Sequence, residues 1–204
     1  MHRVAVFIDW QNTYHWARRA FHAETDPGWC GQIRPRVLAE LLVSKGPAGR
    51  ELAHLAIYTG RPDPRIDPKT SAAHMRQCAA WERDCGELLT LRTRTLRYPP
   101  GWPRAGHAEE KGIDVQLAID AMVMAVRNEY DTAILVTADS DHLPVVEGLQ
   151  ALKVTSGVPE VEVVGWGGVS RKLDAPGVPV RWIGPLDYKA VQDTTDYNIK
   201  PIRR

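Results

Sequence analysis

Short apolar runs alternate with longer helix-like segments along almost the whole chain. Most of the apolar runs are rich in β-branched residues, which predicts strands at residues 3–8, 51–59, 87–98, 132–138, 160–166 and 178–184. Between them, the spacing of apolar residues and the Pro and Gly signals predict helices at residues 12–21, 35–46, 69–86, 111–130 and 144–154. This alternation builds βαβ units, so we expect a three-layer α/β/α sandwich with a central, mainly parallel sheet.

The length and composition narrow the class of protein further. A chain of 204 residues suits one α/β domain, which we expect over residues 1–187, followed by a polar tail over residues 188–204. The net charge of +1 gives no overall basic field, so nucleic acid would have to bind to a local patch. No apolar stretch reaches the length of a membrane span, and the N-terminal run resembles no signal peptide, so we expect no membrane association.

The three cysteines are scattered and form no CxxC pair, which argues against a disulfide framework and against a structural zinc site. Free thiols are typical of a reducing compartment, so the expected location is the cytoplasm.

Aspartates stand where the predicted strands end. Asp9 follows the first strand, Asp139 and Asp141 follow the strand at 132–138, and Asp114 lies near the start of a helix after a Pro- and Gly-rich loop. Sites in parallel sheets form at the carboxyl ends of strands, so these four carboxylates meet if the two strands are neighbours. Protons or cations must relieve their mutual repulsion, and oxygen ligands alone suit Mg²⁺ or Mn²⁺. Residues i and i+2 of an extended chain point the same way, so Asp139 and Asp141 are expected to converge, with Ser140 turned away.

Each of these residues also has a structural interpretation. Asp114 suits the first turn of a helix, Asp141 could cap the helix that starts near Pro144, and Asp9 could form an Asx-turn. Asn12 is expected to cap the helix that it begins. Asp120 lies six positions after Asp114 and therefore on another face of that helix, so we expect it to bond to a loop or an arginine.

Three segments of the chain resemble the motifs of the NYN domain family, which comprises PIN-like ribonuclease domains including the LabA-like group. They are "VFIDWQN", "EKGIDVQLAIDAM" and "AILVTADSDHLPVV", and "VEVVGWGGVSRKL" resembles the last core strand of the family. The resemblance spans residues 3–187 and implies a PIN-like fold that hydrolyses phosphodiester bonds, usually of RNA, with a divalent metal. It makes Asp9, Asp114, Asp139 and Asp141 the metal ligands and Asn12 their polar partner, and it implies products with a 5′-phosphate and a 3′-hydroxyl.

Three residues depart from the family pattern: Trp10 and Ala138 stand at positions that are usually Gly, and His142 stands at a position that is usually Phe. Trp10 has two interpretations, a stacking face for a base or a side chain packed in the core. His142 could donate a proton or contact a phosphate, or it could be a histidine at the surface or at a helix start. The four acids are intact, so the departures bear on the substrate more than on the chemistry.

The expected partner is RNA, with DNA as the second candidate; a homodimer is compatible with the sequence, which gives no sign of one. Lys111 and Ser140 stand inside the motifs as candidate substrate contacts. Several basic residues could steer the nucleic-acid backbone, although charge exposed to solvent is their ordinary interpretation: Arg61, Arg65, Arg92, Arg94, Arg97, Arg171 and Lys172.

Two other functions remain open. One is a PIN-like module that binds RNA or protein without turnover. The other is a haloacid-dehalogenase-like phosphatase, which Gln11 disfavours because that position would need a second acid.

Overall fold

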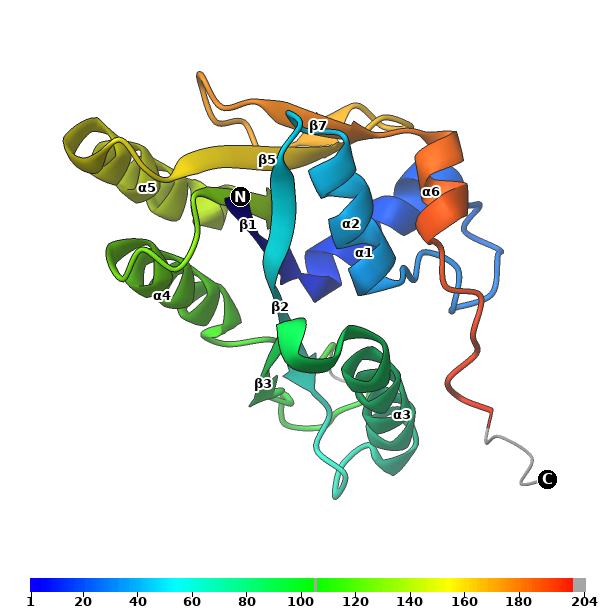
Figure 1. Ribbon diagram of the computed structural model, residues 1–204. Helices are drawn as coiled ribbons and strands as arrows, with labels where there is room; N and C mark the ends of the chain where they lie inside the picture. Colours follow the sequence, from blue (N-terminus) through cyan, green and yellow to red (C-terminus); the bar gives the residue numbers. More distant parts are fainter. Residues whose placement is uncertain (105, 200–204) are drawn as a thin grey trace.

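A seven-stranded, mainly parallel sheet forms the middle layer of the computed structural model, which describes residues 1–104 and 106–199 (Figure 1). The strand order is β3-β2-β1-β4-β5-β6, and β7 pairs with β5. Only β6 runs antiparallel to its neighbour. The strands are β1 (His2–Asp9), β2 (Arg50–Arg61), β3 (Leu89–Thr95), β4 (Thr132–Val136), β5 (Glu160–Trp166), β6 (Arg171–Lys172) and β7 (Val180–Ile183).

Helices cover both faces of the sheet, which gives the expected three layers (Figure 1). One face is covered by α1 (Trp10–Phe21), α2 (Pro35–Ser44), α3 (Pro68–Cys85) and α6 (Pro185–Val191). The other is covered by α4 (Ile113–Val126) and α5 (Leu143–Ser156), and two short 3-10 helices, η1 (Gly86–Leu88) and η2 (Ser140–His142), lie in the connections. Successive side chains of β1 point into the two cores in turn, so this strand is buried on both faces and reads as a continuous apolar run.

The position of β1 decides where a site forms. The chain runs from β1 to β2 on one side, and β4 pairs with β1 on the other side, with Ile8 opposite Val136. The expected parallel pairing of these two strands is therefore confirmed. Strand order diverges at β1 and β4, and such a switch point opens a crevice at the carboxyl ends of the strands.

Some boundaries differ from the expected ones. The helix α4 starts at Ile113 because Gly112 adopts the left-handed conformation, with φ of 75°, and interrupts the helix there. The elements β6 and α6 lie outside the predicted set. Tyr188 and Val191 of α6 are buried in the same core as the apolar residues of α1 and α2, so the folded part of the chain continues past residue 187. Within the described residues, no helix is long and apolar enough to cross a membrane.

A buried ion-pair network joins three strands away from this crevice. Glu162 of β5 accepts hydrogen bonds from Arg50 of β2 at 2.7 Å and from Arg181 of β7 at 2.6 Å and 2.8 Å. The Glu162 side chain is only 4% exposed. Burial alone would raise the pKa of Glu162, but the hydrogen bonds from Arg181 and Arg50 outweigh burial and lower the pKa.

We expect Glu162→Ala to lower the free energy of unfolding by about 3–5 kcal/mol, because it leaves two arginines without their buried partner. The pKa of Glu162 is depressed in the fold, so its contribution is present above the ordinary glutamate pKa and is lost as the pH falls through the folded-state value. Urea unfolding at pH 7 and at acidic pH measures both effects. Glu160→Ala is the matched control, since Glu160 pairs with Lys153 at the surface and should contribute below about 1 kcal/mol. Equal losses from the two variants would contradict the prediction.

Candidate active site

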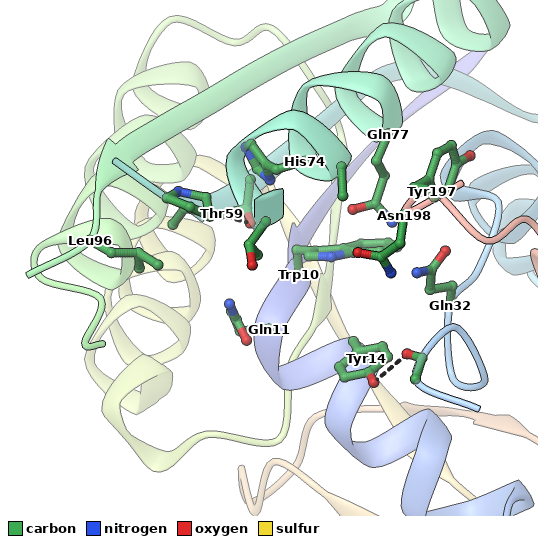
Figure 2. Close-up of a pocket in the computed structure, with 15 residues that line it drawn as sticks. Trp10, Gln11, Tyr14, Gln32, Thr59, His74, Gln77, Leu96, Tyr197 and Asn198 are labelled. Carbon is green, nitrogen blue, oxygen red and sulfur yellow. Dashed lines mark hydrogen bonds between the residues drawn. The ribbon is translucent and has the colours of Figure 1, made fainter. Parts of the chain in front are cut away.

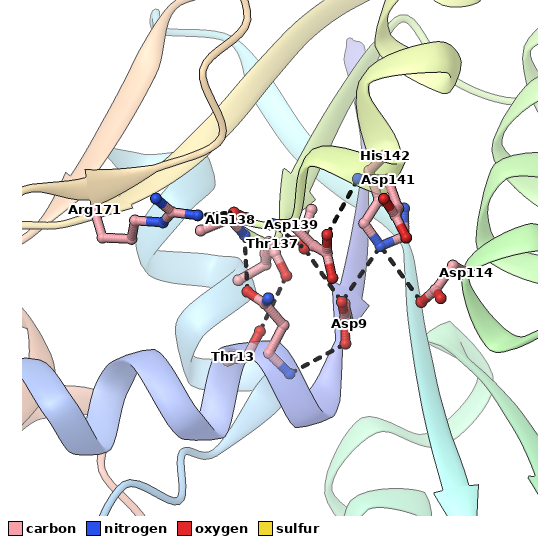
Figure 3. Close-up of polar contacts among 11 residues, drawn as sticks. Asp9, Thr13, Asp114, Thr137, Ala138, Asp139, Asp141, His142 and Arg171 are labelled. Carbon is pink, nitrogen blue, oxygen red and sulfur yellow. Dashed lines mark hydrogen bonds and ion pairs between the residues drawn. The ribbon is translucent and has the colours of Figure 1, made fainter. Parts of the chain in front are cut away.

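Asp9 holds the ends of β1 and β4 together at the crevice (Figure 3). It ends β1 and caps α1, because its Oδ1 accepts a hydrogen bond from the backbone N–H of Asn12 at 3.2 Å. Its Oδ2 accepts from the hydroxyl of Thr137, just beyond β4, at 3.2 Å. The expectation that Asn12 caps the helix is therefore wrong. Its Oδ1 instead accepts a hydrogen bond from the backbone N–H of Ala138 at 2.8 Å. These bonds fix the carboxylate of Asp9 at the mouth of the crevice.

The chain turns directly after β4 and does not stay extended. Asp139 accepts a hydrogen bond from the backbone N–H of Asp141 at 3.1 Å and so caps the 3-10 helix η2. The extended geometry from which we expected Asp139 and Asp141 to converge is therefore wrong, because a 3-10 helix rotates successive side chains by about a third of a turn. The charges of both residues nevertheless act on Asp114 and help to raise its pKa. Asp139 stays near Asp9, since its backbone N–H donates to the same Thr137 hydroxyl. Asp141 and Ser140 are exposed.

The turn carries His142 into the cluster (Figure 3). Its side chain is 1% exposed, and its Nε2 lies 3.3 Å from Asp9 Oδ2 and 3.7 Å from Asp114 Oδ1. The interpretation of His142 as a surface histidine is therefore wrong, whereas its place at a helix start is confirmed, because His142 is the N-cap residue of α5. Burial alone would lower the pKa of His142, but the hydrogen bond and charge of Asp9, followed by the charge of Asp114, raise it. The imidazole compensates the two carboxylates that flank it.

Asp9, Asp114 and His142 form a set of metal-ligand type. One ligand atom of each lies within 4.8 Å of the others, a spread that a single ion can bridge at ligand distances of about 2.0–2.6 Å. Burial, followed by the charge of Asp9, raises the pKa of Asp114, so the ionised cluster is under electrostatic strain that a cation would relieve. Two carboxylates and one imidazole suit Mn²⁺ and similar first-row ions, and they fit Mg²⁺ less well than an oxygen-only set would.

Glu110 is a site residue that the motifs did not single out. Its Oε1 accepts a hydrogen bond from the backbone N–H of Gly60, at the end of β2. Burial is the main cause that raises the pKa of Glu110 to about 7, and the charges of Asp9 and Asp114 raise it as well. A carboxyl group that exchanges its proton near neutral pH is suited to acid–base chemistry. Glu110 is the first residue of the segment EKGIDVQLAIDAM, but it lies in a loop, which has no periodicity to show which side chains turn inward.

The structure separates the candidate substrate residues into two groups. Arg171 donates to the carbonyl of Ala138 at 3.2 Å, beside the acidic cluster (Figure 3). Arg94 donates to Gln116 of α4 at 2.9 Å and lies against Gly112, just before Asp114. These two exposed arginines flank the cluster from opposite sides of β1 and β4.

The other candidates have partners of their own. Arg92 pairs with Asp120 at 3.0 Å, which confirms the expected bond of Asp120 to an arginine. Lys111 pairs with Glu109 at 3.4 Å at the surface. Trp10 is 6% exposed and packs edge-on against Trp81, so the interpretation as a core side chain is confirmed, although part of the residue also lines a cavity described below. Three other basic side chains bond locally, namely Arg61 to Thr95, Arg65 to Asp63 and Lys172 to Asp174. Arg97 is joined to Glu109 through backbone hydrogen bonds.

A second group of potential ligands, His22, Asp26 and Cys30, lies in the loop after α1. The ring nitrogens of His22 are both engaged, at 3.1 Å from Asp26 and 2.8 Å from the hydroxyl of Tyr188. Burial, followed by the charge of Asp26, raises the pKa of the Cys30 thiol, which opposes the thiolate that metals bind. The contacts show how the loop is held against α6.

The fold and the cluster define an α/β/α sandwich with a metal-type site at the carboxyl edge of its parallel strands. The model of the NYN domain family matches residues 3–174, and the chain belongs to this family. NYN domains lie within the PIN-like nuclease superfamily and are generally nucleases. Comparison with curated proteins and with solved structures gave no match.

Proposed function

We propose that the protein is a divalent-metal-dependent nuclease that hydrolyses phosphodiester bonds, with RNA as its main substrate. The observation that carries the proposal is the convergence of Asp9, Asp114 and His142 within 4.8 Å at the carboxyl ends of β1 and β4. These three residues would hold the ion, and Asp139 and Asp141 add negative charge beside them. A bound divalent ion would polarise the scissile phosphate and lower the pKa of an attacking water.

The residues around the cluster have separate tasks in this proposal. Thr137 and Asn12 position Asp9 and the end of β4, so they act on geometry and touch no substrate atom. Glu110, with a pKa of about 7, can accept a proton from the attacking water and release it to solvent. Arg94 and Arg171 would draw the phosphate backbone toward the crevice, with Ser140 and Lys111 as further candidates at its edge.

The test is incubation of the purified protein with end-labelled RNA and single-stranded DNA in Mn²⁺, Mg²⁺ or EDTA. We expect RNA cleavage with Mn²⁺, slower cleavage with Mg²⁺ because one ligand is an imidazole, and none in EDTA. The products should carry a 5′-phosphate, which a 5′-phosphate-dependent exonuclease detects. RNA binding without cleavage in every metal would favour the module without turnover, and release of phosphate from a monoester alone would favour a phosphatase.

A further inference from the structure

A cavity of about 250 Å³ adjoins the acidic cluster, between α1, α3 and the C-terminal segment (Figure 2). It is smaller than the pockets of about 300–1,000 Å³ that hold drug-sized ligands, so it suits one ring system with its substituents. The side chains that give it its character are aromatic or carry amides, namely Trp10, Tyr14, Gln32, Gln77, Tyr197 and Asn198.

The cavity shares a wall with the candidate active site. Gln11 and Gly60 line it, and the backbone N–H of Gly60 donates to Glu110 of the acidic site. Asp9 pairs with Tyr58 of β2, so the cavity opens where β1 and β2 end, and the acidic cluster lies where β1 and β4 end. The cavity and the cluster therefore adjoin at the carboxyl end of β1.

One amide of the cavity has no partner within the part of the chain that the structure describes. Gln77 lines the cavity and is 8% exposed, and its side chain makes no hydrogen bond with a described residue. The Oε1 atom of Gln32 also lacks a described partner, but it is closed to water and therefore does not face the cavity. A largely buried amide costs free energy unless it is hydrogen-bonded, so Gln77 calls for a ligand with a donor or an acceptor. Figure 2 shows Gln77, Gln32 and Asn198 around the Trp10 indole.

The side chains that line the cavity carry no charge at neutral pH. No Asp, Glu, Lys or Arg stands among the described residues that line the cavity. Burial, followed by the charge of Arg61, lowers the pKa of His74 in its wall to about 4, so this imidazole is uncharged at neutral pH. A neutral cavity disfavours a phosphate, whereas aromatic rings and amides match the faces and edges of a nucleobase. The C-terminal wall is held in place, since Arg76 donates to the carbonyl of Tyr197 at 2.7 Å.

We propose that this cavity binds one unpaired nucleobase of the substrate, beside the phosphate at the acidic cluster. The base would stack on an aromatic side chain and bond to Gln77 through its Watson–Crick edge. The inference rests on the proposed function, because it names the part of the nucleic acid that the same site takes. A base in a duplex would have to leave the stack to enter, so single-stranded RNA is the favoured form.

The test measures binding in EDTA, where cleavage does not interfere. Fluorescence anisotropy with a labelled ten-nucleotide RNA should show binding about 10-fold weaker for Gln77→Leu and for Ala73→Phe, which fills the cavity, an effect of the size expected for loss of one stacked base. The matched controls are Gln150→Leu and Ala151→Phe on α5, outside the cavity, and both should bind as the unmodified protein does. Thermal melting verifies that each variant folds.

Crosslinking gives a result that needs no variant. RNA that contains 4-thiouridine should crosslink, in EDTA, to peptides that hold Trp10, Tyr14 or Tyr197. Crosslinks confined to the surface around Arg94 and Arg171, or unchanged affinity in both folded cavity variants, would overturn the base site. Mn²⁺-dependent cleavage alongside such a result would leave the nuclease proposal intact. Crosslinks in the cavity without cleavage in any metal would overturn the nuclease and retain the base site.

Discussion

Asp9→Asn is expected to reduce Mn²⁺-dependent RNA cleavage by at least about 1,000-fold, a loss of about 4 kcal/mol of transition-state stabilisation. Asp9 is the residue on which the site converges, since it contacts Thr137 and His142 and caps α1. Asparagine is an equally good helix cap, and it removes the repulsion between Asp9 and Asp114, so the fold should persist. Cleavage assays with thermal melting in EDTA measure both properties.

The control for Asp9→Asn is the same substitution at Asp174, whose side chain is 94% exposed and pairs with Lys172 at the surface. Asp174→Asn should cleave at the normal rate. If Asp9→Asn also cleaves normally and melts normally, Asp9 does not hold the metal and the proposed centre is wrong. If Asp9→Asn fails to melt cooperatively, calorimetric titration of Mn²⁺ into Asp114→Asn examines the same centre.

Asp114→Asn should lose at least about 100-fold of cleavage, about 2.7 kcal/mol, and should not lower the stability of the metal-free protein. Burial and the charge of Asp9 raise the pKa of Asp114, so its ionised form costs stability that a neutral amide does not. Titration calorimetry should show weaker Mn²⁺ binding, and urea unfolding in EDTA should show an equal or higher free energy of unfolding.

Asp141→Asn is the comparison that separates two assignments of the ligands. Its carboxylate is exposed and lies outside the set of three, so we expect a loss of about 10-fold, the low end of the range for an outer contact. A loss as large as that of Asp114→Asn would instead show that Asp141 reaches the metal, as the motif resemblance implies. Unchanged activity in Asp114→Asn would remove Asp114 from the centre.

The positions of Asp9 and Asp114 could be predicted because their signals are local. An apolar run that ends in Asp marks both the strand and its exit, and a glycine followed by an apolar periodic segment marks a helix start. Alternation of such segments determined the parallel sandwich, and the shared strand pattern placed β1 and β4 side by side. These features depend on the spacing of buried apolar residues along the chain, which can be taken directly from the sequence.

His142, Glu110 and the cavity were decided by the tertiary structure. A single 3-10 turn places His142 inward and Asp141 outward, and no periodicity shows this because the turn is only three residues long. Glu110 is held at the site by the backbone N–H of Gly60, 50 positions away in the chain. The cavity joins α1, α3 and the C-terminal segment, with walls from Trp10 to Asn198. The sequence by itself determined which strands end in carboxylates, whereas the packing of distant segments decided which side chains face them, because contacts between distant segments leave no local pattern.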